Sequence, residues 1–144
     1  MTPTQRTLAH LRRAGFVAEI VERWLPGANV RKDFLGFGDV LAFHPTDRRF
    51  VLVQVTSTGV AARRKKILTE KATEAEAWLT AGGEIEVHGW RKILDATGNP
   101  RWAIRVDTLR LDDLGALTVD KAPRPPAPRR PRDPQLTFLE SVSQ

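Results

Sequence analysis

The chain has 144 residues, 41% of them hydrophobic, which is enough for one folded domain with a buried core. It contains no cysteine, so disulfides, thiolate metal sites and cysteine nucleophiles are excluded, and its formal net charge of +6 favours an anionic partner. No apolar run approaches the roughly 18 residues of a membrane span, and residues 1–7 lack the apolar core of a signal peptide. We therefore expect a cytoplasmic protein with no membrane contact.

The first predicted element is a helix that begins after Thr2. Thr2 as the N-cap and Gln5 three residues later form the pattern of a capping box, and Gly15 ends the helix. The pattern at residues 16–24 fits either a strand or a helix, and the glycine stop before it favours a strand. A turn at 25–29 and an extended or irregular stretch at 30–37 follow. The capping pattern gives Gln5 a structural role at the helix start.

Two apolar strands joined by a tight turn are predicted at residues 39–43 and 50–56. Asp39 opens the first strand, and Gln54 lies inside the second as an isolated polar residue. If the turn is centred at 46–47, Asp39 and Gln54 are direct cross-strand neighbours with Cβ atoms about 5 Å apart. Since side chains in a strand alternate between the two faces, both would then point to the same side of the sheet.

A carboxylate and an amide oxygen side by side are hard oxygen ligands and suit a cation such as Mg²⁺. The alternative is that Asp39 caps its strand and Gln54 has an ordinary hydrogen-bond partner, because an unpaired polar group in an apolar strand costs roughly 2–7 kcal/mol. Asp33 lies on the glycine-containing approach to Asp39, where it is either an additional carboxylate of the site or a turn cap.

Residues 60–80 predict one long helix with an apolar stripe that contains Leu68, Ala72, Ala75 and Leu79. A second hairpin is predicted from a strand at residues 84–90, a turn at 95–100 and a strand at 101–109. The element order, a helix, three strands, a helix and two strands, predicts an α/β domain over residues 1–120, with a mixed sheet flanked by helices.

The start of this long helix carries four consecutive cations, Arg63, Arg64, Lys65 and Lys66. Cations near a helix N-terminus oppose the helix dipole and so cost the helix some stability. A bound phosphate would offset that cost, because backbone N–H groups and cationic side chains would converge on the anion. The cluster is therefore predicted to bind DNA, and the alternative is a solvated surface.

The C-terminal residues 121–144 are predicted to be a disordered basic tail. Residues 121–134 hold six prolines and five Lys or Arg, a composition that does not bury a core. The tail ends in a segment similar to the short peptides with which bacterial replication and repair proteins dock on the sliding clamp, through Gln135, Leu136, Phe138 and Leu139. The alternative is a chance apolar end.

Residues 36–57 and the basic helix after them resemble the core of the PD-(D/E)XK nuclease superfamily. The similarity rests on the run G-x-x-D-V-L-A-F, a turn and V-L-V-Q-V-T-S. Small resolvase-like members and their phage relatives are the most similar, and the order of elements agrees over residues 4–90. The resemblance implies a restriction-endonuclease-like fold with a metal, Mg²⁺ or Mn²⁺, bound by Asp39, Gln54 and the carbonyl of Val55.

The resemblance implies a catalytic position at Thr56, where this sequence departs from the family pattern because most members have a lysine there. A hydroxyl carries no positive charge to stabilise a developing oxyanion. In some members the following helix supplies this lysine, which here makes Lys66 or Lys65 the candidate. The first-helix glutamate of many relatives is also missing, since Thr4 and Gln5 occupy that region.

The expected function is a metal-dependent DNA endonuclease, similar to Holliday-junction resolvases, that hydrolyses phosphodiesters in branched or structured DNA. The alternative is a catalytically degenerate member of the same fold that binds DNA as an accessory in recombination or replication. A third interpretation is an interaction protein that acts through its tail. The expected partners are DNA, the sliding clamp and a second copy of the chain.

Overall fold

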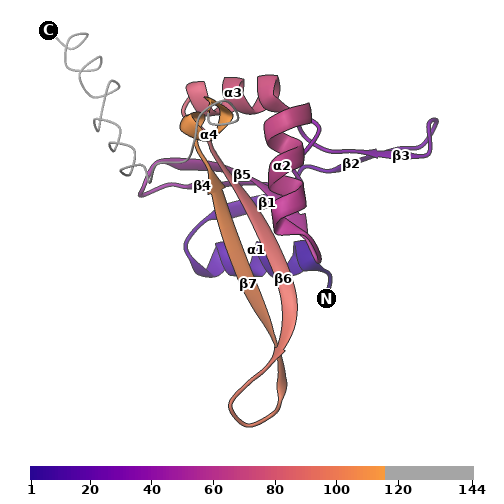
Figure 1. Ribbon diagram of the computed structural model, residues 1–144, viewed down its shortest axis with the longest axis vertical. Helices are drawn as coiled ribbons and strands as arrows, with labels where there is room; N and C mark the ends of the chain where they lie inside the picture. The colour runs from indigo at the N-terminus through magenta and orange to yellow at the C-terminus, as the bar shows by residue number, and fades with distance from the viewer. Residues whose placement is uncertain (116–144) are drawn as a thin grey trace, which may run out of the picture.

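The computed structural model describes residues 1–115 of the chain. The predicted tail at 121–144 lies outside the described residues, together with its clamp-like peptide, Gln135, Leu136, Phe138 and Leu139. The described part is a mixed α/β structure in which helices flank a mixed β-sheet (Figure 1). Within residues 1–115, no helix is long and apolar enough to span a bilayer.

In chain order the elements are α1 (Pro3–Arg13), β1 (Val17–Ile20), β2 (Arg23–Leu25), β3 (Val30–Lys32), β4 (Val40–His44), β5 (Arg49–Thr56), α2 (Val60–Glu70), α3 (Ala72–Thr80), β6 (Glu84–Leu94), β7 (Pro100–Leu109) and α4 (Leu111–Gly115). The main sheet has the strand order β1-β4-β5-β6-β7. Only β5 and β6 run parallel, which requires the crossover made by α2 and α3. β2 and β3 form a separate hairpin that projects from the body (Figure 1).

Hydrophobic cores lie on both faces of the main sheet. α1 packs on one face, where Leu8 and Leu11 join a cluster with Val53. α2 and α3 pack on the other face, where Ile67 joins a cluster with Leu52. β5 lies in the middle of the sheet and is buried on both faces, which explains its nearly continuous apolar sequence.

The predicted start of α1 is confirmed. The backbone N–H of Gln5 donates to the Thr2 hydroxyl at 3.2 Å, and the backbone N–H of Thr2 donates to the Gln5 side chain at 2.9 Å. These two reciprocal bonds complete the capping box and satisfy two backbone groups that the helix itself leaves without partners. The Gln5 side chain is therefore occupied at the helix start.

The predicted register of the central hairpin is also confirmed. Val40 pairs with Val53 and Leu41 with Leu52, so the next position places Asp39 opposite Gln54. The backbone N–H of Asp39 continues the ladder by donating to the Val53 carbonyl at 2.9 Å. Both polar side chains lie on the sheet face that α2 and α3 cover.

The prediction of a single strand at residues 16–24 is wrong. β1 ends at Ile20, and after Val21 the chain leaves the main sheet for the β2–β3 hairpin. Val21 still donates its backbone N–H to the carbonyl of Asp39 at 3.0 Å, which holds the exit point beside the start of β4. The residues beyond it find their strand partners in β3, so β2 belongs to a different sheet.

The prediction of one helix at residues 60–80 is also wrong, because Lys71 separates α2 from α3. Lys71 has φ −121°, outside the helical region. Two residues earlier the Thr69 hydroxyl donates to the carbonyl of Lys65 at 2.8 Å, a contact that weakens and bends helices. After the break, α3 packs on β6. The sequence also did not predict the short helix α4, which follows β7.

The second hairpin is confirmed, but its first strand is longer than predicted. β6 runs to Leu94 instead of ending near residue 90, and the turn is closed by Asp95, whose backbone N–H donates to the carbonyl of Asn99 at 2.8 Å. The carboxylate of Asp95 also accepts the backbone N–H of Thr97 at 2.9 Å. The outer part of the hairpin, residues 89–105, extends beyond the helices as an arm (Figure 1). We call this segment the β6–β7 arm.

A glycine at the base of this arm allows α2 to sit close to the sheet. A Cβ atom added at Gly89 would lie 2.2 Å from Cγ2 of Val60, the first residue of α2. Gly89→Ala should therefore lower the free energy of unfolding by about 1–3 kcal/mol, because a stiff β-branched side chain must move. Chemical denaturation measures this change.

Gly27→Ala is the matched control, since a Cβ there meets nothing within 4 Å. We expect that substitution to change the free energy of unfolding by less than about 0.5 kcal/mol. Equal stability of the two variants would contradict the close approach of α2 to β6.

Candidate metal centre

The centre is built around Asp39, a buried carboxylate at the start of β4. Its side chain is only 7% exposed. Oδ2 of Asp39 accepts the backbone N–H of Val55 at 2.8 Å and the side-chain amide N–H of Gln54 at 2.9 Å. Both donors belong to β5, so the central strand fixes the position and direction of this carboxylate.

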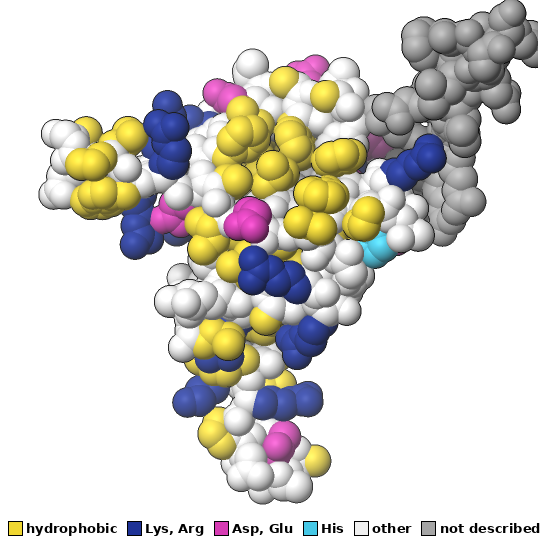
Figure 2. Space-filling model, turned by 180° about the vertical axis from the view of Figure 1, so that it is seen from behind, with side chains coloured by type: hydrophobic (Ala, Val, Ile, Leu, Met, Phe, Trp, Pro, Cys, Tyr) yellow, Lys and Arg dark blue, Asp and Glu magenta, His cyan; other side chains and the backbone are white. Residues whose placement is uncertain are grey.

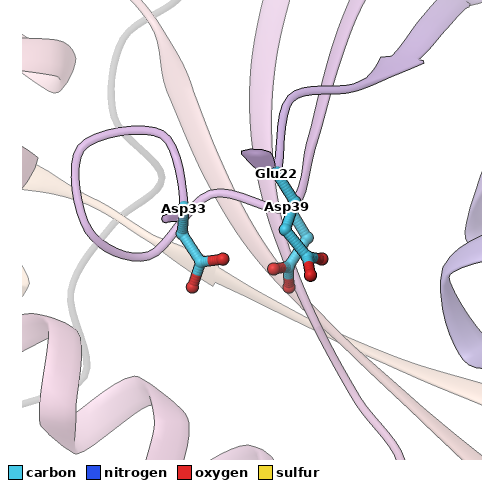
Figure 3. A group of neighbouring side chains, drawn as sticks. All are labelled: Glu22, Asp33 and Asp39. Atoms are coloured by element: carbon cyan, nitrogen blue, oxygen red, sulfur yellow. The ribbon is translucent and has the colours of Figure 1, made fainter. Parts of the chain in front are cut away.

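Two further carboxylates lie next to Asp39. Glu22 follows β1 and Asp33 follows β3, so the β2–β3 hairpin leaves the body at one of them and returns at the other. One carboxylate oxygen of each of the three residues lies within 4.8 Å of the others. Figure 3 shows Asp33 reaching in from its loop toward Glu22 and Asp39, with the three side chains pointing the same way.

The charge balance at this cluster is unusual. Burial raises the pKa of Asp39 to about 7; the N–H of Val55 opposes this shift, and the negative charges of Asp33 and Glu22 add to it. Glu22 has a counter-ion, since Arg31 in β3 contacts it at 2.8 Å. Within residues 1–115, Asp33 and Asp39 form no ion pair with a cation.

These residues fit a divalent metal ion. Three carboxylates with converging oxygens are the ligands that Mg²⁺ and Mn²⁺ prefer. A 2+ ion would also supply the positive charge that Asp33 and Asp39 lack, and it would favour the ionised form of Asp39. The arrangement brings Asp39 and Asp33 together and adds Glu22 to them, and metal binding by these residues stays a prediction.

Gln54 lies beside the cluster, as its register predicts. In the structure its amide nitrogen faces Asp39 and also reaches the Val55 carbonyl at 3.5 Å. To offer its oxygen to a metal, the amide of Gln54 would have to turn by half a rotation, since oxygen and nitrogen occupy opposite ends of the group. Metal binding by Gln54 and by the carbonyl of Val55 stays a prediction.

Thr56 lies on the same strand, but its hydroxyl serves the turn into α2. It donates to the carbonyl of Thr58 and accepts the backbone N–H of that residue at 3.1 Å. These bonds shape the residues that precede the helix. A catalytic role for Thr56 stays a prediction, and the structure gives its hydroxyl local partners.

The four cations of α2 have different environments. Arg64 is half-buried and pairs with Asp113 of α4 at 3.0 Å, so its charge is used inside the protein. The other three, Arg63, Lys65 and Lys66, are exposed. Among the described residues, none of the four forms an ion pair with the acidic cluster. DNA binding by this group stays a prediction.

A different lysine approaches the cluster's loop. Lys71, at the break between α2 and α3, lies against Gly36, in the turn between Asp33 and Asp39. A Cβ added at Gly36 would lie 2.9 Å from Nζ of Lys71. The amine of Lys71, at the C-terminal end of α2, therefore lies next to the segment that carries Asp33 and Asp39. The sequence had suggested the lysines nearer the start of the helix.

Sequence reasoning missed both Glu22 and Lys71. The prediction of one continuous strand at 16–24 placed Glu22 in its interior, whereas the chain turns away at that residue. Lys71 was missed because the predicted helix did not end there. A signal for Lys71 existed, since it lies four residues after Ile67 and three after Leu68 and so puts a charge on the apolar face of the predicted helix.

Comparison of the chain with protein families, with curated proteins and with solved structures finds no match.

The raised pKa of Asp39 predicts how stability depends on pH without metal. The pKa in the folded protein, about 7, is above the ordinary value of 3.8, so the folded state holds the proton more tightly than the unfolded state. Its stabilising contribution is complete below pH 3.8 and is lost as the pH rises through about 7. In EDTA, the free energy of unfolding should fall between pH 5 and 8 by on the order of 1–4 kcal/mol.

Asp39→Asn is the control, because its amide does not titrate and should remove most of this fall. At pH 8, added Mg²⁺ or Mn²⁺ should stabilise the wild type and leave Asp39→Asn unchanged, since bound metal stabilises only the folded state. Denaturation curves at each pH measure both effects. Parallel pH profiles of the two proteins would contradict the burial of an ionisable Asp39.

Proposed function

We propose that this protein is a metal-dependent DNA endonuclease of the PD-(D/E)XK type, with a restriction-endonuclease-like fold. The observation that carries the proposal is the convergence of Glu22, Asp33 and Asp39 beside Gln54, at the end of the central strand. Phosphodiester hydrolysis commonly uses such carboxylate groups to hold divalent ions. The substrate class we propose is branched or structured DNA.

The fold supports this proposal through the order of its elements. The antiparallel pair β4–β5 carries Asp39 and Gln54, α2 and α3 then cross over, and β6 returns parallel to β5. This agrees with the predicted order of a helix, strands, a helix and strands around a mixed sheet. The net charge of +6 is consistent with a polyanionic substrate.

Each residue of the centre has a distinct role in this mechanism. A Mg²⁺ or Mn²⁺ ion held by Glu22, Asp33 and Asp39 would supply Lewis-acid chemistry at the scissile phosphate. Gln54 and the N–H of Val55 keep Asp39 in position by donating to its carboxylate. The ammonium of Lys71 would stabilise negative charge that develops on the phosphate.

A second function is favoured by the position of Thr56. It stands where the family pattern has a lysine, and its hydroxyl is bound within the turn before α2. A protein with this arrangement that had lost catalysis would still bind DNA and could act as an accessory in recombination or replication. The two functions differ in whether metal-dependent cleavage occurs.

Conservative changes at the centre should separate cleavage from binding. Asp39→Asn and Glu22→Gln should each lower the rate of Mg²⁺- or Mn²⁺-dependent cleavage at least about 100-fold, because each removes a charged ligand. DNA affinity measured in EDTA should stay within about twofold of wild type. A gel assay with labelled four-way junction, duplex and single-stranded DNA measures the cleavage rates.

Asp47→Asn is a control for the loss of a carboxylate, since Asp47 lies in the exposed β4–β5 turn. The Asp47→Asn variant should cleave DNA at the wild-type rate. Activity of the wild type in EDTA, or full activity of Asp39→Asn, would exclude the proposed metal centre. If the wild type binds DNA but cleaves none of the three substrates with either metal, the accessory function is favoured.

The lysine that assists catalysis can be identified by comparing Lys71, just after α2, with Lys65 and Lys66 in the middle of that helix. Lys71→Ala should lower the single-turnover rate at saturating protein about 100-fold, because its amine lies beside the loop of the acidic cluster. The double substitution Lys65→Ala and Lys66→Ala should weaken DNA binding and leave that rate nearly unchanged. Quenched-flow measurements over a range of protein concentrations separate the two parameters.

If the double substitution at Lys65 and Lys66 lowers the single-turnover rate and Lys71→Ala does not, the catalytic charge belongs to Lys65 or Lys66, as the sequence alone suggested. A circular dichroism melt of each variant checks that the fold is intact. This matters most for Lys71, which is half-buried.

A further inference from the structure

The β6–β7 arm is a basic projection of the described structure. Its residues 89–105 contain four cations, Arg91, Lys92, Arg101 and Arg105, and one acidic residue, Asp95. Figure 1 shows the arm extending away from the helices, and Figure 2 shows dark blue basic side chains along it. All four cations are exposed, so this charge faces solvent.

The strand register sorts the four cations onto two faces. Gly89 pairs with Arg105, Arg91 with Ala103 and Ile93 with Arg101, so three arginines lie on one face of the arm. Lys92 pairs with Trp102 and lies on the other face. We call the first surface the arginine face, and it is on the side of the sheet that holds α2.

The arginine face keeps its charge available. Arg91 and Arg101 form no ion pair within residues 1–115, whereas Arg105 donates from two guanidinium nitrogens to the two carboxylate oxygens of Asp107, each at 3.4 Å. Elsewhere this chain uses arginines internally, as in the contact of Arg49 with Glu84 at 2.8 Å. Arg91 and Arg101 are therefore free to bind an external anion, and Arg105 lies beside them with a long, exposed ion pair that an anion could replace.

The opposite face of the arm is braced against the body. The guanidinium of Arg6 in α1 lies 4.2 Å from the centre of the Trp102 ring, a cation–π contact. Deeper in the sheet, the indole N–H of Trp90 donates to the hydroxyl of Thr7 at 2.9 Å. These contacts attach the base of the arm to α1, which lowers the cost of ordering that part when a ligand binds.

A groove continues the arginine face at the base of the arm. It has a volume of about 660 Å³ and runs between the segment 57–61, which leads into α2, and the two strands of the arm. Arg91 and Arg105 line its arm side. A strand of nucleic acid that lies along the arginine face would therefore have room to continue toward α2.

We propose that the β6–β7 arm is a DNA-binding β-ribbon whose arginine face contacts the phosphates of duplex DNA. A two-stranded ribbon fits the major groove of B-DNA, which is about 12 Å wide. Arginine suits this role because its planar guanidinium can donate two hydrogen bonds to one phosphate. The choice of DNA as the polyanion rests on the proposed function.

The test is DNA binding in EDTA, where the proposed cleavage is absent. Fluorescence anisotropy with a short labelled duplex measures the Kd from about 50 to 200 mM salt. The triple variant Arg91→Gln, Arg101→Gln, Arg105→Gln should bind at least 10-fold more weakly. For the triple variant, the slope of log K against log salt concentration should be smaller in magnitude by about 2–3, since each lost phosphate contact lowers it by about 0.9.

Neighbouring positions give a matched control for the direction of the arm. Arg91→Gln and Lys92→Gln remove the same charge one residue apart but on opposite faces. Arg91→Gln should weaken binding about threefold or more, and Lys92→Gln should change it less than twofold. A thermal melt of each variant confirms that these exposed substitutions preserve the fold.

Three results would overturn the role of the arm: a triple variant with wild-type affinity and salt slope, equal effects of Arg91→Gln and Lys92→Gln, or no duplex binding by the wild type. Failure of the nuclease proposal is distinguishable from these. If the wild type binds duplex DNA through the three arginines but does not cleave it with Mg²⁺ or Mn²⁺, the nuclease proposal is contradicted and the DNA-binding role of the arm is supported.

Discussion

Two hydrogen bonds to a single carboxylate oxygen determine where the acidic cluster forms. Oδ2 of Asp39 accepts from the backbone of Val55 and from the amide of Gln54, both on β5. Since β5 is buried on both faces, it offers the firmest attachment in the sheet. Glu22 and Asp33 are then placed against this fixed carboxylate by shorter and more exposed segments, so the geometry of the whole centre follows from one strand pair.

The same arrangement opposes folding when no cation is present. A carboxylate that is 7% exposed beside two others gains little from water and is repelled by its neighbours, as the raised pKa of Asp39 shows. The apolar clusters on the two faces of the sheet must outweigh this cost. Proteins commonly keep locally destabilising arrangements of this kind at functional sites.

The sequence predicted the features that depend on residues close together in the chain. Its predictions failed for features that depend on contacts between distant segments. The register that pairs Asp39 with Gln54 follows from a tight turn and alternating side chains, and it is confirmed. The position of Glu22 depends on β1 pairing with β4, whose partners are 20 or more residues apart in the sequence, and no local pattern encodes it. Lys71 approaches Gly36 only because the helix breaks, and a propensity pattern favoured continuing it. The reach of β6 to Leu94 was missed because no core lies beneath it to impose a clear periodicity.

The β2–β3 hairpin starts just after Glu22 and ends just before Asp33, and nearly all of its side chains are exposed. Its two ends lie at the acidic cluster, next to the backbone bonds Val21 N–H to Asp39 O and Phe34 N–H to Gly38 O, while most side chains of the hairpin itself are exposed. A hairpin of another length or sequence could be exchanged here without moving either carboxylate, provided that the partner of Glu22, Arg31, is kept. The fold thus separates a buried carboxylate, Asp39, held by the central strand from an exposed segment at the rim of the cluster, and changes in such a surface segment need not disturb the buried residues.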